Sequence, residues 1–234
     1  MRKVLVLIAV LLLAVPTAQA DQIGSFFGNL STANTLAKGY TAVGFRLGVA
    51  GVNSFIGSIA HGLPARMEIK IKAGLVRGGT INSELIDNEL ALGVDLKWQV
   101  LNVHPSSNPA KTSAPFDLAF GTFAEWLKLR FDGNPFIESP SALQAGVQMI
   151  ASYPIALSMG GSVAPYASAN IRQEWLMEGA GPSWPSSIDP DFNQAAWGFH
   201  GGLSWYPRAA PLALFAEYQY DGNDGLFGGV EYIF

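Results

Sequence analysis

Polar and apolar residues alternate along most of this chain, in runs of around ten residues. In residues 89–100, Leu90, Leu92, Val94, Leu96, Trp98 and Val100 alternate with Glu89, Ala91, Gly93, Asp95, Lys97 and Gln99. A β-strand places successive side chains on opposite faces, so a period of two predicts one face in apolar surroundings and one in polar surroundings. A run of about ten residues is also what a tilted strand needs to cross a bilayer.

The composition fits strands that cross a membrane. Of the 234 residues 49% are hydrophobic and 14% are charged, whereas about a quarter is charged in a usual soluble domain. Beyond the first twenty residues, no uncharged apolar run reaches the roughly 18 residues that a membrane helix requires. A transmembrane barrel explains both facts, because its lipid-facing residues alternate with lumen-facing ones. Composition alone also fits a soluble β-sandwich or a lipocalin-type barrel.

The amino-terminal residues have the pattern of a secretory signal peptide. Arg2 and Lys3 precede an apolar stretch over 4–15, and Ala18-Gln19-Ala20 forms a small-x-small cleavage site. Cleavage near Ala20 lowers the formal net charge from −4 to about −6, which argues against nucleic acid as a partner. We therefore divide the chain into a signal peptide (1–20), a periplasmic segment (21–35), either a short helix or a tail, and a barrel (36–234).

The alternating runs predict an all-β, antiparallel up-and-down transmembrane β-barrel of about ten strands, with eight as the alternative. The run over 53–61 is weak because neither face is cleanly apolar. The run over 116–130 changes phase after Glu125, which predicts a bulge near Trp126 or a strand that leaves the membrane there. The ten predicted strands are 36–49, 53–61, 66–77, 88–101, 116–130, 141–153, 161–176, 195–206, 211–220 and 225–233.

The last six residues, Gly229-Val230-Glu231-Tyr232-Ile233-Phe234, describe a closing strand with aromatic residues on one face. Gly229, Tyr232 and Phe234 resemble the C-terminal assembly signal of bacterial outer-membrane barrels. With the alternation and the signal peptide, the mature chain resembles the small OmpA/OmpX-like and opacity-type barrels. This resemblance implies a location in the outer membrane, contact with its lipid, and recognition by the barrel-assembly machinery. If Phe234 ends in the periplasm, the connections 78–87, 131–140, 177–194 and 221–224 face outward.

Charged residues on the polar faces form the first candidate site. Their mixed signs allow them to pair across a narrow lumen, where a charge needs partners because desolvation is costly. A structural network of this kind is favoured over a narrow pore, since ion filters usually present rings of one sign. The predicted lumen charges are Arg46, Glu68, Lys70, Lys72, Glu89, Asp95, Lys97, Arg172, Glu174, Glu217 and Glu231.

The sequence favours a non-enzymatic protein without cofactors or metal. His200 faces the lumen by alternation, but Ser204, the serine nearest along its face, is ~13 Å away along the strand. Ten-stranded omptin proteases carry a histidine on the outer rim, and no histidine maps to that rim here. The chain has no cysteine, and the Asp and Gly residues of 221–225 indicate a tight hairpin rather than a calcium loop.

We therefore expect an integral outer-membrane barrel with a largely plugged lumen, acting in envelope integrity or surface interaction. The alternatives are a narrow channel for small solutes or, less favoured, a lipid-modifying outer-membrane enzyme. The sequence identifies no surface ligand.

Overall fold

The structure is a computed structural model of the whole chain. It describes residues 25, 27–29, 31–77, 80–81, 84–85, 89–102, 116–128, 141–158, 160–177, 193–222 and 224–234. The predicted signal peptide and its cleavage site lie outside the described residues, as do His104 and most of the predicted loops 131–140 and 177–194. None of the described helices is long and apolar enough to span a membrane.

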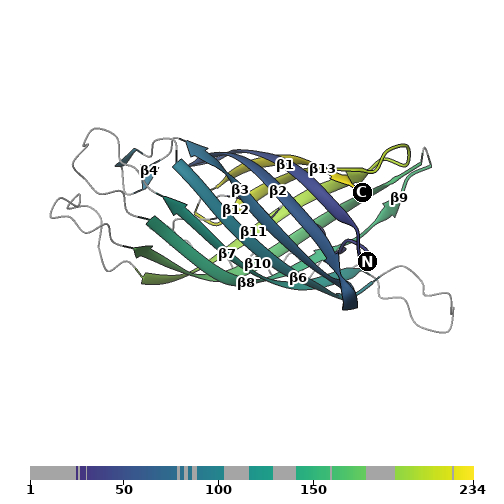
Figure 1. Cartoon of the computed structure of the whole chain (residues 1–234), viewed down its shortest axis with the longest axis horizontal. Helices are drawn as coiled ribbons and strands as arrows, with labels where there is room; N and C mark the ends of the chain where they lie inside the picture. Colours follow the sequence, from purple (N-terminus) through teal and green to yellow (C-terminus); the bar gives the residue numbers. More distant parts are fainter. Residues whose placement is uncertain are drawn as a thin grey trace, which may run out of the picture.

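Ten long antiparallel strands form the wall of a barrel (Figure 1). They are β1 (Thr41–Val49), β2 (Asn53–Leu63), β3 (Met67–Arg77), β6 (Glu89–Leu101), β7 (Asp117–Lys128), β8 (Ser141–Ser152), β10 (Ser162–Met177), β11 (Asn193–Tyr206), β12 (Leu212–Tyr220) and β13 (Gly225–Ile233). Each predicted strand corresponds to one of them, so the all-β barrel of ten strands is confirmed and the alternative of eight is wrong. The weak run over 53–61 is the regular strand β2.

Short elements occupy some of the connections. Between β3 and β6, the strands β4 (Thr80–Ile81) and β5 (Glu84–Leu85) pair as a separate hairpin. The two-residue strand β9 (Ile155–Ala156) pairs with the start of β10, and the 3-10 helix η1 (Pro64–Arg66) joins β2 to β3. We call the end of the barrel that carries η1, β9 and Phe234 the C-terminal end, and the opposite end, near β4, the loop end (Figure 1).

The barrel closes by pairing its last strand with its first. The register of β1 and β13 runs from Ala42 opposite Ile233 to Val49 opposite Leu226. Beyond the strand ends, Thr41 and Phe234 exchange two backbone hydrogen bonds, of 2.9 and 2.8 Å. Closure removes the free edges that would otherwise pair with other chains.

The predicted bulge near Trp126 is wrong. Pairing of β7 with β8 continues without a register shift from Asp117 to Lys128. Glu125 faces inward, and Lys128 is an outward-facing residue that ends the strand, so period two is not broken. The irregularity lies instead in β6, where the register with β7 shifts between Gln99 and Leu101.

The barrel has an apolar outside and a polar inside. Large apolar side chains on the outward faces are exposed, for example Ile71 (60%), Ile171 (65%) and Leu226 (65%). Most charged side chains of the strands point inward and are buried, such as Arg46 and Glu125, both 2% exposed. This is the reverse of a soluble protein, in which charged residues are almost never fully buried.

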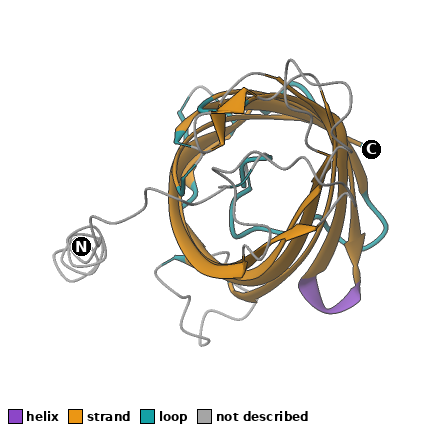
Figure 2. Ribbon diagram, turned by 90° about the vertical axis from the view of Figure 1, so that its left-hand side faces the viewer, coloured by secondary structure: helices purple, strands orange, loops and turns teal. Residues whose placement is uncertain are grey.

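Part of the chain before the first strand lies inside the barrel. Viewed from the loop end, a loop crosses the interior of the ring of strands (Figure 2). Phe27 and Ala33 are 0% exposed and Thr32 is 2% exposed. The sequence suggested a short helix or a periplasmic tail for residues 21–35, whereas the described residues of this stretch lie inside the ring of strands. Contacts with inward-facing side chains hold them inside.

Barrel closure can be tested with paired cysteines, because the chain has no native cysteine. Ala42 and Ile233 face each other next to the hydrogen-bonded Thr41–Phe234 pair, so they form a non-hydrogen-bonded pair, the type with the closest side chains. We expect Ala42→Cys with Ile233→Cys to form an intramolecular disulfide on oxidation, measured by thiol titration and gel mobility.

A misregistered pair provides the control. Gly229 lies four residues from Ile233, which is about 13 Å along the strand and beyond the reach of a disulfide. Ala42→Cys with Gly229→Cys should remain reduced under the same conditions. Equal cross-linking of both pairs would contradict this register.

Candidate functional site

The candidate site is the barrel lumen, and its central feature is the stretch of residues 25–36, which we call the N-terminal segment. Ser25 lies near the loop end, where its backbone N–H donates to Asp221 at 3.1 Å. Leu36 lies near the C-terminal end, where its N–H donates to Glu68 at 2.9 Å. The eleven residue steps from Ser25 to Leu36 span at most ~36–40 Å when fully extended, enough to run the length of the wall.

Small inward-facing residues leave room for this segment. Ala91 and Ala119 are buried on the inner face, and Gly93 lies directly beside Phe27. A Cβ atom at Gly93 would lie 3.2 Å from the ring of Phe27 and 2.9 Å from the side chain of Lys72. Larger side chains at these positions would compete with the segment for the same space.

Phe27 and Gly28 pack in the half of the lumen nearer the loop end. The ring of Phe27 is fully buried, with the Lys72 ammonium 4.8 Å from its centroid, a cation–π contact. Gly28 has φ +64°, and a Cβ atom there would come within 2.8 Å of Gln219 Nε2. Glycine at this position therefore avoids both backbone strain and a clash.

Charged wall residues bind the main chain of the segment at its middle. The backbone N–H of Asn29 donates to Glu217 at 2.8 Å, and its carbonyl oxygen accepts from Arg46 at 3.5 Å. The Asn29 side chain also donates to Ser168 at 3.2 Å. An extended segment without strand partners needs such acceptors and donors, because a buried backbone group without a hydrogen bond is costly.

Lys97 also binds the main chain of the segment, nearer the C-terminal end. Its ammonium donates to Ser31 Oγ at 2.7 Å and to the carbonyl oxygens of Thr32 at 3.1 Å and Asn34 at 2.7 Å. Glu68 lies 3.3 Å from the same ammonium. One buried cation therefore holds three consecutive parts of the segment against the wall.

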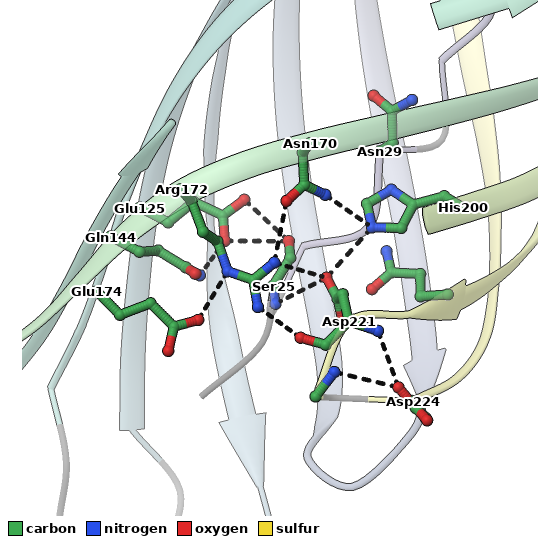
Figure 3. Close-up of polar contacts among 12 residues, drawn as sticks. Ser25, Asn29, Glu125, Gln144, Asn170, Arg172, Glu174, His200, Asp221 and Asp224 are labelled. Atoms are coloured by element: carbon green, nitrogen blue, oxygen red, sulfur yellow. Dashed lines mark hydrogen bonds and ion pairs between the residues drawn. The ribbon is translucent and has the colours of Figure 1, made fainter. Parts of the chain in front are cut away.

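A carboxylate at the loop end joins the segment to two strands (Figure 3). Glu125 accepts hydrogen bonds from Ser25 Oγ at 3.2 and 3.1 Å and from Gln144 at 2.7 Å. It also accepts from Lys72 at 3.1 Å. Lys72 also lies 2.8 Å from Asp95. Glu125 is thus a centre of this network, although the alternation over 116–130 did not settle which face of the strand it occupies.

His200 lies between two carboxylates that both bind the segment. Its Nε2 is 3.2 Å from Asp221 Oδ2 and 3.3 Å from the Asn170 side chain (Figure 3). Its Nδ1 is 3.9 Å from Glu217. Asp221 lies in the turn after β12. Burial acts to raise the pKa of Asp221, but the hydrogen bond with His200 and the charge of Arg172 outweigh it and hold that pKa below its usual value.

Arg172, on β10, ties that strand to the turn after β12. Its guanidinium donates to Glu174 at 2.7 Å, to Asn170 at 3.0 Å and to the main-chain oxygen of Asp221 (Figure 3). The side chains of Arg172 and Glu174 are 0% exposed. A planar guanidinium with several donors suits a buried position with acceptors on more than one side.

A third cluster lies in the half nearer the C-terminus. Glu231 Oε1 accepts from Lys70 at 2.7 Å and from Arg46 at 3.1 Å. All three residues are at most 8% exposed. One carboxylate on β13 therefore neutralises two cations, from β1 and β3, across the closing seam.

Two lumen serines bond to groups other than the imidazole of His200. A general base needs a nucleophile within hydrogen-bond reach. Ser25 Oγ bonds to Glu125 rather than to His200, and Ser204 Oγ donates to the carbonyl oxygen of Ala164. Within the described residues no group of three His, Asp or Glu side chains could hold a metal ion.

The structure places most of the residues proposed from the sequence inside the barrel. Ten of them are buried there; Glu89 is only half-buried at the start of β6 and makes no ion pair within the described part of the chain. The roles of Ser25, Asn29 and Asp221 in the lumen were not predicted from the sequence. The sequence does contain one indication of the segment. Many inward-facing residues are Gly, Ala or Ser, and their small side chains cannot fill the lumen by themselves.

No protein-family model matches this sequence, and no curated protein matches it either. Function is therefore inferred from the chemistry of the lumen and of the outer face.

Removing the charge of Glu231 tests the network. Glu231→Gln leaves Arg46 and Lys70 buried without their shared anion, and losing one partner of a buried pair costs about 3–5 kcal/mol. We expect a loss of this size in the free energy of unfolding, measured by urea denaturation of the detergent-solubilised protein.

Two variants serve as comparisons. Glu89→Gln makes the same chemical change at a residue that has no ion pair with the described residues, and it should alter stability little. Adding Lys70→Met to Glu231→Gln should recover part of the loss, because one unpaired cation is then removed. Equal stability of the Glu231 and Glu89 variants would exclude a structural role for this cluster.

Proposed function

We propose that this protein is an integral outer-membrane β-barrel whose lumen is closed by its own N-terminal segment. Its role is structural, in envelope integrity or in surface interaction through the loop end, rather than transport or catalysis. The observation that carries the proposal is the reversed polarity of the barrel, with charges inside and an apolar surface outside.

The outward strand faces support a lipid environment. On the ten barrel strands as described, the only outward-facing charged residues are Arg77 and Lys128, each the last residue of its strand at the loop end. Monomeric soluble proteins rarely expose an apolar patch of more than a few hundred Å², whereas here the apolar surface surrounds the barrel. A hydrocarbon layer would solvate this surface at no cost.

Aromatic side chains lie on the outer face towards both ends of the barrel. Trp98, Trp205, Tyr232 and Phe234 lie towards the C-terminal end and are 44–62% exposed. Trp126, Trp175, Trp197 and Tyr218 lie towards the loop end. Two aromatic girdles flanking an aliphatic band are typical of outer-membrane barrels.

The lumen supports closure rather than conduction. Its buried charges have mixed signs, five basic and eight acidic among the described residues. They bind one another and the N-terminal segment, so they do not form a ring of one sign around an open path. The segment runs along the lumen where a solute would have to pass.

The closing strand supports an interaction with the barrel-assembly machinery. Tyr232 and Phe234 are 50% and 62% exposed on the outer face, where another protein could contact them before the barrel closes. Gly229 lies opposite both Arg46 and Phe215 in its two neighbouring strands. Gly229, Tyr232 and Phe234 are therefore proposed as the recognised residues.

Membrane location has a simple test. We expect the protein to fractionate with the outer membrane and to migrate faster on a gel before heating than after it, because a closed barrel resists detergent. A protein that stays in solution without detergent would overturn the proposal.

Conductance in planar bilayers tests closure. We expect the wild-type protein to give no discrete openings, because the segment and the charged side chains that bind it occupy the lumen. A variant lacking residues 25–36 should conduct if it inserts. Frequent wild-type openings would favour the narrow-channel alternative, whatever the deletion variant does.

A further inference from the structure

A cavity of about 360 Å³ lies in the lumen at the C-terminal end. It is bounded on one side by the N-terminal segment and on the other by the inner faces of β3, β6 and β10–β13. Tyr40, 53% exposed, is part of its lining, so the cavity opens at this end of the barrel. Small-molecule sites begin at about 300 Å³, which makes this cavity large enough for a small ligand.

Two of the four charged residues in the lining are already fully used by the segment. Lys97 makes three hydrogen bonds to Ser31, Thr32 and Asn34, and Glu68 accepts from Leu36 while facing Lys97. These residues hold the segment and have little capacity for a ligand.

The other two, Lys70 and Glu231, retain capacity. An ammonium has three donors and a carboxylate has two acceptor oxygens. Lys70 makes one hydrogen bond, to Glu231 Oε1 at 2.7 Å, and Arg46 binds the same oxygen. Within the described part of the chain, two N–H groups of Lys70 and the Oε2 atom of Glu231 therefore have no protein partner.

An apolar wall adjoins this charged pair. Phe215 is 8% exposed, and its ring packs edge-on against Tyr206 at 6.3 Å. Ile233 and Ala213 complete the wall. A donor, an acceptor and an apolar surface thus border one space.

We propose that this cavity binds a small α-amino acid with an apolar side chain. Its carboxylate would accept from Lys70 and its ammonium would donate to Glu231 Oε2, while its side chain would pack against Phe215 and Ile233. A zwitterion satisfies both buried charges and adds no net charge to the lumen, where an unbalanced charge is costly. The inference is independent of whether the barrel conducts.

Binding is tested by isothermal titration of the detergent-solubilised protein with L-leucine. N-acetyl-L-leucine amide keeps the side chain but has neither charge, and glycine keeps the charges but has no side chain. We expect L-leucine to bind at least tenfold more tightly than either compound. No detectable binding of L-leucine, or equal binding of the amide, would overturn the proposal, as would equal binding of a neutral sugar such as glucose.

A matched pair of variants locates the site. Ala213→Leu fills part of the cavity without altering the ion pairs, and Ala216→Leu makes the same change on the outward face of the same strand. We expect at least a tenfold loss of affinity for the first and no change for the second. Unchanged binding by a folded Ala213→Leu protein would contradict binding in this cavity.

Discussion

The burial of charge inside a closed barrel is the constraint on which the rest of this structure depends. A closed wall with an apolar exterior leaves its polar side chains no direction but inward, and each buried charge then requires a partner. Glu231 forms ion pairs with Arg46 and Lys70, and Glu125 forms an ion pair with Lys72. Other charges bind the main chain of the N-terminal segment: Glu217 accepts from the N–H of Asn29, and Lys97 donates to the carbonyl oxygen of Thr32.

The segment and the wall therefore depend on each other. Without the segment, Lys97 would lose its three acceptors and Glu217 its backbone donor. Without the wall, the backbone groups of Asn29 and Leu36 would lose their partners.

The fold could be predicted from the sequence because alternation is a local property. Leu92 and Asp95 lie on opposite faces of a strand wherever that strand lies, and ten such runs with a closing strand determine a barrel. The same alternation correctly predicted that charged residues such as Lys70 and Arg172 face inward. The bulge was placed wrongly because Lys128 was taken to need an inward position, whereas a strand end tolerates an outward charge.

The N-terminal segment could not be predicted, because its position depends on contacts far apart in the sequence. Ser25 meets Glu125 and Asp221, and no periodicity within residues 21–35 indicates this. Asp221 was assigned to a hairpin on local grounds, and its backbone does make that turn, with Asp224 accepting from the N–H of Asp221 and of Gly222. Its side chain has a second role that only the assembled lumen reveals.

The central claim is that the N-terminal segment and the side chains that bind it close the lumen, apart from the cavity at the C-terminal end. It is tested most directly by the reactivity of single cysteines at Ala91 and Ala119, both 0% exposed on the inner face. In protein reconstituted into bilayers, a small cationic thiosulfonate reagent should leave both cysteines unmodified while a cysteine at the exposed Lys38 reacts to completion. Modification of the two inner cysteines at the rate of the exposed one would show a water-filled lumen and contradict the account.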